Sequence, residues 1–344
     1  MIFNDSAFGG HEQVCFFHDK TTNLRAIIAI HNTNLGPALG GCRLWPYQSE
    51  NEALHDVLRL SRGMTYKAAM AKLPLGGGKS VIIKDPNMPK TPELMEAMGK
   101  CVERLKGLYI TAEDVGTTVN DMESIRKHTK HVCGASSSSG GSGDPSPFTA
   151  MGVLWGIEAS VNYALKQENL SGLSAVVQGV GSVGAHLCQF LHDRGVKLYV
   201  SDIHPSSTDI MVSKYGATCL DPEKVLTQKA DIFVPCALGG IINEKTIPLL
   251  NVRIVAGSAN NQLETSEDGE ALKSRGILYA PDYITNAGGL INVWYEGDDY
   301  NRDKALSHIQ HIPETLLEVF ELADKKEICT AKAADQIAES RFMK

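Results

Sequence analysis

The 344-residue sequence predicts an α/β fold of two domains, the second of which contains a doubly wound parallel sheet. Three observations lead to this prediction. The chain is longer than an ordinary single domain. Short apolar strands and amphipathic helices alternate after residue 147, which is the pattern of βαβ units. A Ser/Gly/Pro-rich segment at 134–147 separates this pattern from the first half, and its composition is typical of a linker or hinge.

In the first half, apolar periodicity predicts strands of β-branched residues between helices with apolar positions three and four residues apart. Thr91 followed by Pro92 is a typical helix start. Gly63 is expected to break the segment 50–71 into two helices. The expected strands are 24–31, 80–84 and 108–114, and the expected helices lie within 50–71, 91–105 and 119–130.

In the second half, the sequence predicts a long helix, then a strand, glycine turn and helix, then further short strands, and two closing helices. Two of the strands, 230–238 and 253–261, are short apolar runs that end in small and polar residues. The predicted segments are 148–166, 173–195, 196–203, 230–238, 253–261, 276–283, 303–325 and 330–341.

Composition excludes several classes of protein. A net charge of −7 argues against a nucleic-acid partner, which would favour a basic face. No apolar run reaches the ~18 residues of a membrane span, and the N-terminus lacks the features of a signal peptide. The eight cysteines are scattered, so they are expected to be reduced thiols of a cytoplasmic protein. His and Cys show no metal-ligand spacing, so no metal site is predicted.

The segment "QGVGSVG" matches a dinucleotide-binding turn. Gly179, Gly181 and Gly184 have G-x-G-x-x-G spacing between a strand and a helix, and Asp202 follows eighteen residues after Gly184. The helix N-terminus favours phosphates, and the acid can accept hydrogen bonds from ribose hydroxyls. Asp202 would repel a 2′-phosphate, which favours NAD over NADP, although His204 could soften this preference. The cofactor-binding residues expected here are Gly179, Val180, Gly181, Ser182, Val183, Gly184 and Asp202.

The segment "PLGGGKSVI" raises the question of a triphosphate site. A phosphate loop requires a glycine five positions before Gly78 and a helix after the lysine, but Leu73 stands there and a β-rich run follows. We expect instead that the glycines let a ligand approach the backbone near Lys79. Shielding from water lowers the pKa of a lysine, which can then accept a proton. Lys67, twelve residues upstream, could share the pocket. The alternative interpretation of either lysine is a solvated charge on the protein surface.

Five segments, taken in order, resemble the amino-acid dehydrogenase family of glutamate, leucine, phenylalanine and valine dehydrogenases. They are "LGPALGGCR" (35–43), "RGMTYKAAMAKLPLGGGKSVI" (62–82), "TAEDVGTT" (111–118), "GSANNQL" (257–263) and "NAGGLINV" (286–293). The resemblance covers nearly the whole chain, and leucine dehydrogenases are the most similar members. It implies reversible oxidative deamination, in which hydride passes from Cα to NAD⁺ and the iminium is hydrolysed to ammonia and a 2-oxo acid.

The resemblance also implies roles for particular residues. Lys67 would hold the substrate carboxylate, Lys79 would be the general base, and Asp114 would shuttle a proton to or from the amino group. A carboxylate close to a cationic iminium suits this chemistry. The cofactor-binding residues that the resemblance adds are Thr149 at the nicotinamide amide, Asn260 or Asn261, Ala237 and Asn286.

The expected side-chain pocket is apolar. It consists of Leu39, Gly40, Ala112, Leu290 and Val293. Leu39 stands where members acting on glutamate carry lysine, so a substrate carboxylate would be left unpaired there. The resemblance therefore implies leucine, isoleucine or valine as substrate. The alternatives are an aromatic substrate such as phenylalanine or tryptophan, an imine reductase, and a catalytically silent dinucleotide-binding protein.

The resemblance further implies a domain arrangement. Residues 1–135 would form an α/β substrate-binding and oligomerisation domain, to which C-terminal helices at about 310–344 return. Residues 146–309 would form the Rossmann-type NAD-binding domain across a cleft, with 134–147 as part of the hinge. We expect a homo-oligomer, with a dimer favoured and an octamer possible, and neither nucleic acid nor membrane as partner.

Overall fold

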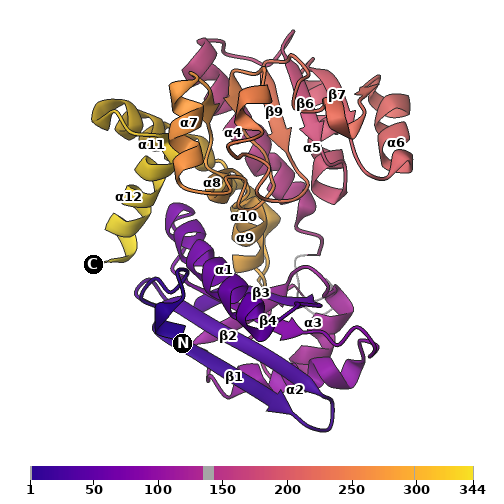
Figure 1. Cartoon of the computed structure of the whole chain (residues 1–344), viewed down its shortest axis with the longest axis vertical. Helices are drawn as coiled ribbons and strands as arrows, with labels where there is room; N and C mark the ends of the chain where they lie inside the picture. The colour runs from indigo at the N-terminus through magenta and orange to yellow at the C-terminus, as the bar shows by residue number, and fades with distance from the viewer. Residues whose placement is uncertain (1, 135–142, 298, 344) are drawn as a thin grey trace. The chain divides into compact units, whose positions relative to one another are not determined.

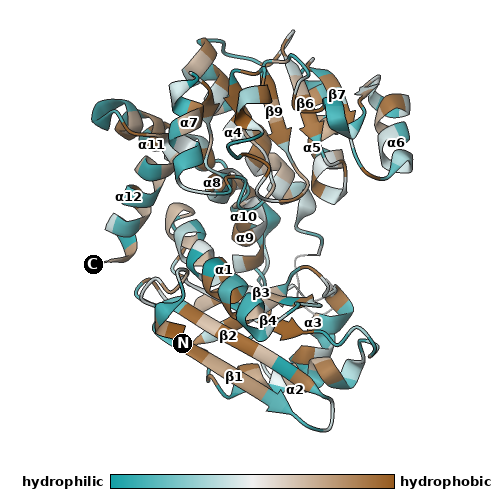
Figure 2. Cartoon of the chain, viewed as in Figure 1, coloured by the Kyte–Doolittle hydropathy of each residue, from teal (hydrophilic) through white to brown (hydrophobic). Residues whose placement is uncertain are grey.

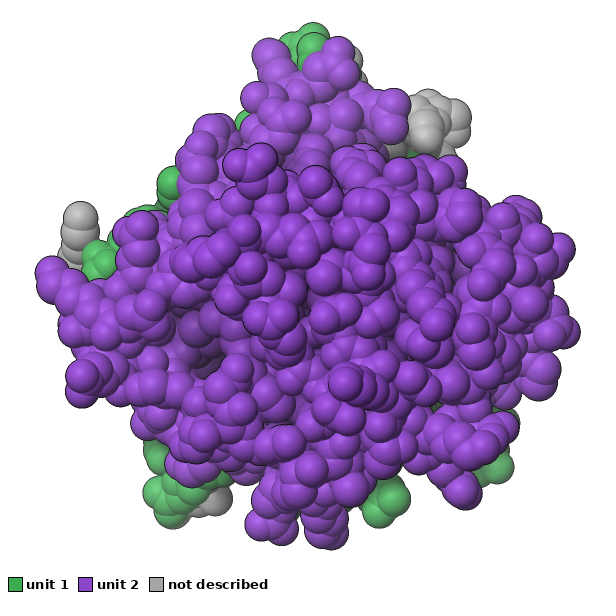
Figure 3. Space-filling view, turned by 90° about the horizontal axis from the view of Figure 1, so that it is seen from above, with its two compact units in different colours: residues 1–144, 293–301, 338–344 green, residues 145–292, 302–337 purple. Residues whose placement is uncertain are grey.

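The computed structural model describes residues 2–134, 143–297 and 299–343, so most of the predicted hinge, 135–142, lies outside the described residues. The chain forms two compact units, coloured separately in Figure 3. The first unit comprises 1–144, 293–301 and 338–344, and the second comprises 145–292 and 302–337.

The first unit contains a five-stranded mixed sheet in the order β1-β2-β4-β3-β5. The strands β1, β2 and β4 are antiparallel, whereas β3 runs parallel to both β4 and β5. The elements of this unit up to residue 126 are a short 3₁₀ helix (Ile2–Asn4), β1 (Gln13–Asp19), β2 (Leu24–Asn32), β3 (Ala38–Trp45), α1 (Glu50–Met70), β4 (Gly76–Ile83), α2 (Pro92–Glu103), β5 (Tyr109–Glu113) and α3 (Val119–Arg126). Figure 1 shows α1 lying along β2 and β4.

The helix α1 is continuous, so the expected break at Gly63 is wrong. A glycine inside a helix costs only about 1 kcal/mol, and packing readily outweighs this cost. Val57 and Leu58 of α1 pack against Ile27 and Val81 of the sheet, while α2 and α3 cover the opposite face. The α1 face of this sheet also carries the first part of the candidate site.

The second unit contains a six-stranded sheet in the order β11-β10-β9-β6-β7-β8, and every pair is parallel. This confirms the predicted doubly wound sheet. The order reverses between β6 and β9, which is where such sheets bind ligands at their carboxyl ends. Figure 2 shows β6 and β9 as hydrophobic, as expected for strands buried between helices. The elements up to residue 279 are α4 (Ser146–Leu165), β6 (Ser174–Gln178), α5 (Ser182–Asp193), β7 (Lys197–Ser201), α6 (Pro205–Tyr215), β8 (Thr218–Cys219), two 3₁₀ turns (Pro222–Lys224 and Ile247–Leu249), β9 (Ile232–Pro235), β10 (Ile254–Val255), α7 (Glu267–Ser274) and β11 (Leu278–Tyr279).

The C-terminal part departs from the sequence-based expectation in two ways. The predicted helix 303–325 is divided, because Pro313 lies in the first turn of a new helix. Residues 310–337 group with the second unit, where α11 packs against α4, and only 338–344 group with the first. Conversely, 293–301 group with the first unit rather than with the predicted domain 146–309. The closing helices are α8 (Asp282–Thr285), α9 (Gly288–Trp294), α10 (Arg302–Ile309), α11 (Ile312–Lys326) and α12 (Thr330–Phe342).

None of the helices in the described part of the chain combines the length and the apolar character that crossing a bilayer requires.

Candidate active site

The glycines that precede Lys79 serve close packing inside the first unit. A Cβ added to Gly77 would lie 2.0 Å from the backbone nitrogen of Thr65 in α1, and one added to Gly78 would lie 2.7 Å from the ring of Tyr109. All eight residues of β4 are buried. The expectation that these glycines leave room for a ligand is therefore wrong, because protein atoms occupy that space. The glycines instead let α1 approach the strand that carries the lysine.

Lys79 and Asp114 form a shielded ion pair. Lys79 lies on β4 and is 6 % exposed, and its Nζ is 3.0 Å from Oδ2 of Asp114, which follows β5 directly. Gly41 on β3 makes room for the acid, since a Cβ there would lie 2.7 Å from the Asp114 Cβ. The register of three neighbouring strands thus brings together two residues that are 35 positions apart in the sequence.

Arg43 is a third member of this arrangement, and the sequence-based reasoning missed it. Its Nε donates to Oδ2 of Asp114 over 3.0 Å, and a terminal guanidinium nitrogen donates to Asp56 of α1 over 3.0 Å. The hydroxyl of Tyr47 also donates to Asp56, over 2.6 Å. Arg43 ends the "LGPALGGCR" segment, but no spacing rule links it to residue 114.

The charges around Asp114 set its protonation state. Burial raises the pKa of this carboxyl, but the positive charges of Lys79 and Arg43 outweigh burial, so the pKa lies below its usual 3.8. The carboxylate is therefore ionised near neutral pH. Lys79 and Arg43 both contact Oδ2, and Oδ1 of Asp114 accepts no hydrogen bond from the described residues. One carboxylate oxygen is thus held while the other can still accept a proton.

The other expected substrate residues of the first unit lie on the same strands and on α1. Lys67 is half-buried in the last turn of α1, two residues beyond the Thr65 that packs on Gly77. Leu39 pairs with Gly77 across β3 and β4, and Ala112 of β5 pairs with Gly41 of β3. Leu39 and Ala112 are both buried.

The remaining expected pocket residues are distributed between the two units. Gly40 is buried on β3 of the first unit, next to Leu39. Val293 also belongs to the first unit, whereas Leu290, three residues earlier in α9, belongs to the second. Both α9 residues are half-buried.

The glycine turn of the second unit has the geometry of a phosphate-binding turn. Gly179 has φ +91°, a conformation that favours glycine, and it leads from β6 into α5. A Cβ on Gly184 would lie 2.1 Å from the Gly179 carbonyl oxygen, so Gly184 allows close packing of helix on turn. A Cβ on Gly181 would meet nothing within 4 Å. Gly181 is the N-cap of α5, and no side chain of the described residues caps this helix, so its first N–H groups remain available to a ligand such as a phosphate.

Asp202 fixes this turn from the end of β7. Its Oδ2 accepts from the backbone N–H of Val180 over 2.8 Å, and its Oδ1 accepts from the backbone N–H of His204 over 2.9 Å. Each oxygen retains a second lone pair. The adjacent Ile203 is 83 % exposed, so the apolar surface beside the acid is open. These residues fit a dinucleotide, with the pyrophosphate at α5 and the adenosine ribose at Asp202.

The residues expected at the nicotinamide end lie at the carboxyl edge of the same sheet. The Asn286 side-chain nitrogen donates to Oδ1 of Asn260 over 3.0 Å and to the Ser258 carbonyl over 3.1 Å. The side-chain oxygen of Asn286 is buried and accepts no bond from the described part of the chain. A buried amide oxygen without a donor is costly, which fits a site completed by a ligand's N–H.

Three further expected residues border the same edge. Thr149 in α4 donates from its hydroxyl to the Pro145 carbonyl over 3.1 Å. Ala237 lies directly against the glycine turn, because a Cβ on Gly179 would lie 2.8 Å from its backbone nitrogen. Asn261 has φ +52° and an exposed side chain, and its carbonyl accepts from the backbone N–H of Gly240.

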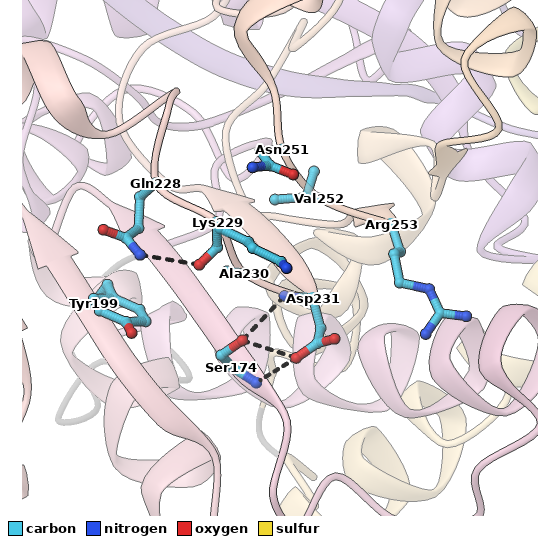
Figure 4. A pocket seen from close by; sticks show the side chains of 9 residues that line it. All are labelled: Ser174, Tyr199, Gln228, Lys229, Ala230, Asp231, Asn251, Val252 and Arg253. Carbon is cyan, nitrogen blue, oxygen red and sulfur yellow. Dashed lines mark hydrogen bonds between the residues drawn. The ribbon is translucent and has the colours of Figure 1, made fainter.

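A different cavity opens at the amino ends of these strands (Figure 4). It measures about 480 Å³ and is bordered by Ser174, which begins β6, and by Asp231 and Arg253, which precede β9 and β10. The Asp231 carboxylate accepts from the backbone and hydroxyl of Ser174 over 2.9 and 2.8 Å. Parallel sheets bind ligands at their carboxyl ends, where the glycine turn lies. Asp231 therefore joins the starts of two strands, at the end of the sheet opposite to the glycine turn.

Two family descriptions match segments of this chain. The description "Glu/Leu/Phe/Val dehydrogenase, dimerisation domain" matches residues 11–131, and "Glutamate/Leucine/Phenylalanine/Valine dehydrogenase" matches residues 198–303. A leucine dehydrogenase of Geobacillus stearothermophilus is 51 % identical over 96 % of this chain and 90 % of its own length. An L-tryptophan dehydrogenase of Nostoc punctiforme is 48 % identical over 99 % of this chain and 96 % of its own.

The solved structures show the same relationship. The crystal structure of L-tryptophan dehydrogenase from Nostoc punctiforme superimposes with a TM-score of 0.84 at 46 % identity, covering 97 % of this chain and 96 % of that one. The matched range 11–131 includes Lys79 and Asp114, and the matched range 198–303 includes the acid at the end of β7. The chain therefore belongs to the Glu/Leu/Phe/Val dehydrogenase family of amino-acid dehydrogenases.

Proposed function

We propose that this protein catalyses the reversible, NAD-dependent oxidative deamination of branched-chain aliphatic L-amino acids to 2-oxo acids and ammonia. The observation that carries the proposal is the shielded ion pair between Lys79 on β4 and Asp114 directly after β5, two strands of the first unit that are separated by β3. Groups that give protons to or take protons from one substrate amino group must each lie within hydrogen-bond reach of it, so they must lie close together.

In this proposal each polar residue has one task. Lys67 binds the substrate carboxylate. In its neutral form Lys79 accepts a proton from the substrate ammonium and releases it to solvent before it accepts another from the attacking water, and Asp114 relays protons to and from the nitrogen. The ionised Asp114 also stabilises the cationic iminium. Bound NAD⁺ takes the hydride from Cα, and the protein supplies alignment and excludes water.

The apolar character of the expected pocket supports a branched-chain substrate. Leu39 and Ala112 are buried and uncharged, so nothing on β3 or β5 at these positions could pair with a substrate side-chain carboxylate. One methylene in such a pocket is worth ~1–3 kcal/mol, so leucine, isoleucine and valine should all react. The alternative is an aromatic substrate, which the likeness to the tryptophan dehydrogenase of Nostoc punctiforme favours.

We further propose NAD as the preferred cofactor. The Asp202 carboxylate is fixed by Val180 and His204 at the end of β7, where it would accept from ribose hydroxyls and repel a 2′-phosphate. For the nicotinamide end, the bond from Asn286 supports Asn260 over Asn261 as the residue that orients the ring.

The assembly proposed is a homodimer, with an octamer as the alternative. The strand β1 is an edge strand of the first sheet, and Phe16 on it is 62 % exposed, so an apolar side chain lies beside unpaired backbone groups. A second copy could cover this edge. We also propose a cytoplasmic location, which the eight free cysteines support.

A substrate panel tests this proposal. Initial rates of NADH formation are measured with L-leucine, L-isoleucine, L-valine, L-phenylalanine, L-tryptophan and L-glutamate, each with NAD⁺ and with NADP⁺. We expect the aliphatic substrates with NAD⁺ to give the highest kcat/KM and glutamate to give none. A preference for phenylalanine or tryptophan would establish the aromatic alternative, and no turnover with any amino acid would establish a silent dinucleotide-binding protein.

A further inference from the structure

The contacts of Asp114 are asymmetric. Two cations, Lys79 and Arg43, contact the same oxygen, Oδ2, each over 3.0 Å. The other oxygen, Oδ1, accepts nothing from the described residues. A carboxylate held by one oxygen cannot rotate freely, so the direction of the second oxygen is fixed as well.

Arg43 is itself fixed from the other side. Its guanidinium spans two carboxylates, with Nε on Asp114 and a terminal nitrogen on Asp56. Asp56 also accepts from the Tyr47 hydroxyl over 2.6 Å, which keeps its carboxylate turned toward the arginine. The side chains of Arg43 and Asp56 are 21 % and 28 % exposed, so these pairs are partly desolvated.

We propose that Arg43 is a positioning residue for the proton relay, with Asp56 and Tyr47 as its support. Arg43 holds Oδ2 of Asp114 so that Oδ1 faces the amino group of the substrate. Lysine could not do this, because only the planar guanidinium offers donors to two carboxylates in a fixed geometry. This inference rests on the proposed function, since it assumes that Asp114 is the relay.

The charge of Arg43 also affects the protonation of Asp114. Burial raises the pKa of Asp114. Arg43 is one of the two cations that outweigh burial and keep this pKa low. Removing an adjacent arginine raises a carboxyl pKa by roughly one to three pH units. Removing the negative charge of Asp56 acts in the opposite direction, because a like charge disfavours ionisation. Both effects act on every group of the site that must lose a proton for turnover, so Arg43→Gln should move the acid limb of the pH profile up and Asp56→Asn should not.

The experiment measures kcat and kcat/KM for L-leucine against pH in four variants of the full chain. For Arg43→Gln, we expect the acid limb to move up by about one pH unit or more and kcat to fall at every pH. Arg43→Lys should keep the acid limb near its wild-type position but lose kcat. Asp56→Asn should lower kcat while its acid limb stays or moves down. Arg194→Gln, which removes another Nε–carboxylate pair, is the control and should match the wild type.

The outcomes are distinguishable. Coincident acid limbs for the wild type and Arg43→Gln overturn the proposal, as do shifts in the same direction for Arg43→Gln and Asp56→Asn. If Arg43→Gln does not fold, the pH profiles of Arg43→Lys and Asp56→Asn test the proposal without it. If the wild type turns over no amino acid, the proposed function fails. The carboxyl ¹³C titration of Asp114, assigned with Asp114→Asn, then still shows whether Arg43→Gln raises the pKa of that group, and an unchanged titration overturns the link between the two residues.

Discussion

Replacing Asp114 by asparagine should separate the two roles of the ion pair, in stability and in catalysis. Asparagine keeps the shape of the side chain but removes the charge that faces Lys79 and Arg43. An opposite-charge pair at about 4 Å contributes ~4 kcal/mol of Coulomb energy at an effective dielectric constant near 20. Removing one partner of a buried pair typically costs 3–5 kcal/mol of stability. Because the Asp114 side chain is 17 % exposed, we expect the free energy of unfolding to fall by ~3 kcal/mol, at the low end of this range.

The catalytic loss should be larger than this loss of stability suggests. An amide can relay no proton and stabilises no iminium, so kcat is expected to fall by ~10²–10⁴-fold. Urea unfolding gives the stability change, and steady-state NADH formation gives the kinetic change. The matched control is Asp121→Asn, which removes the charge facing Lys90 in another partly buried pair of the first unit. The control should lose stability and keep most of its kcat; equal losses of kcat in both variants would refute the reasoning.

The same pair makes a prediction about pH. The pKa of Asp114 is lowered in the folded chain from a usual value of 3.8, so its ionised form stabilises the fold above about pH 3.8 and this stabilisation disappears as pH falls further. The stability gap between the wild type and Asp114→Asn should therefore be constant near neutral pH and shrink in acid. A gap that widened in acid would mean that the carboxylate is not stabilised by its cations.

Three further predictions concern other parts of the two units. Gly77→Ala should destabilise the fold by ~1–3 kcal/mol or more, because the new Cβ meets the Thr65 backbone. Gly181→Ala should leave the melting temperature unchanged and weaken the affinity for NAD, measured by calorimetry. Asp202→Asn should raise KM for NAD⁺ and reduce discrimination against NADP⁺, since it loses the charge that repels a 2′-phosphate. Burial, with the charge of a neighbouring histidine, lowers the pKa of His31 from 6.5 to about 4. The neutral ring therefore stabilises the fold above about pH 6.5, and up to about 3 kcal/mol of the free energy of unfolding is lost as the pH falls toward 4. In urea titrations, His31→Gln should flatten this dependence of stability on pH.

Much of the fold could be predicted from periodicity, because most of its elements are long and amphipathic or short and apolar between turns. The doubly wound sheet follows from alternating elements and from the glycine turn at 179–184, which local rules describe. The strands β1 and β3 were missed. The first is a half-exposed edge strand, and the second contains two glycines and no continuous apolar run. The break expected at Gly63 failed because packing of α1 outweighs intrinsic helix propensity.

The candidate site could be predicted only where a motif or the family resemblance marked a residue. Lys79 stood out behind three glycines, yet the reason for the glycines lay in Thr65 and Tyr109, which the sequence does not connect to them. Arg43 had no signal of its own. Its importance depends on strand register, which brings β3 beside β5 and places Asp114 over Gly41. Contacts between residues far apart in sequence are the information that local patterns lack.

Single-turnover formation of NADH by Lys79→Ala tests the central claim most directly. Enzyme in excess is mixed with L-leucine and NAD⁺, and the affinity for NAD⁺ is measured separately by calorimetry. We expect the rate of NADH formation to fall by at least ~100-fold while the affinity for NAD⁺ stays at its wild-type value, because Lys79 lies in the first unit and the residues proposed to bind the dinucleotide lie in the second. A wild-type rate in the variant would contradict the account.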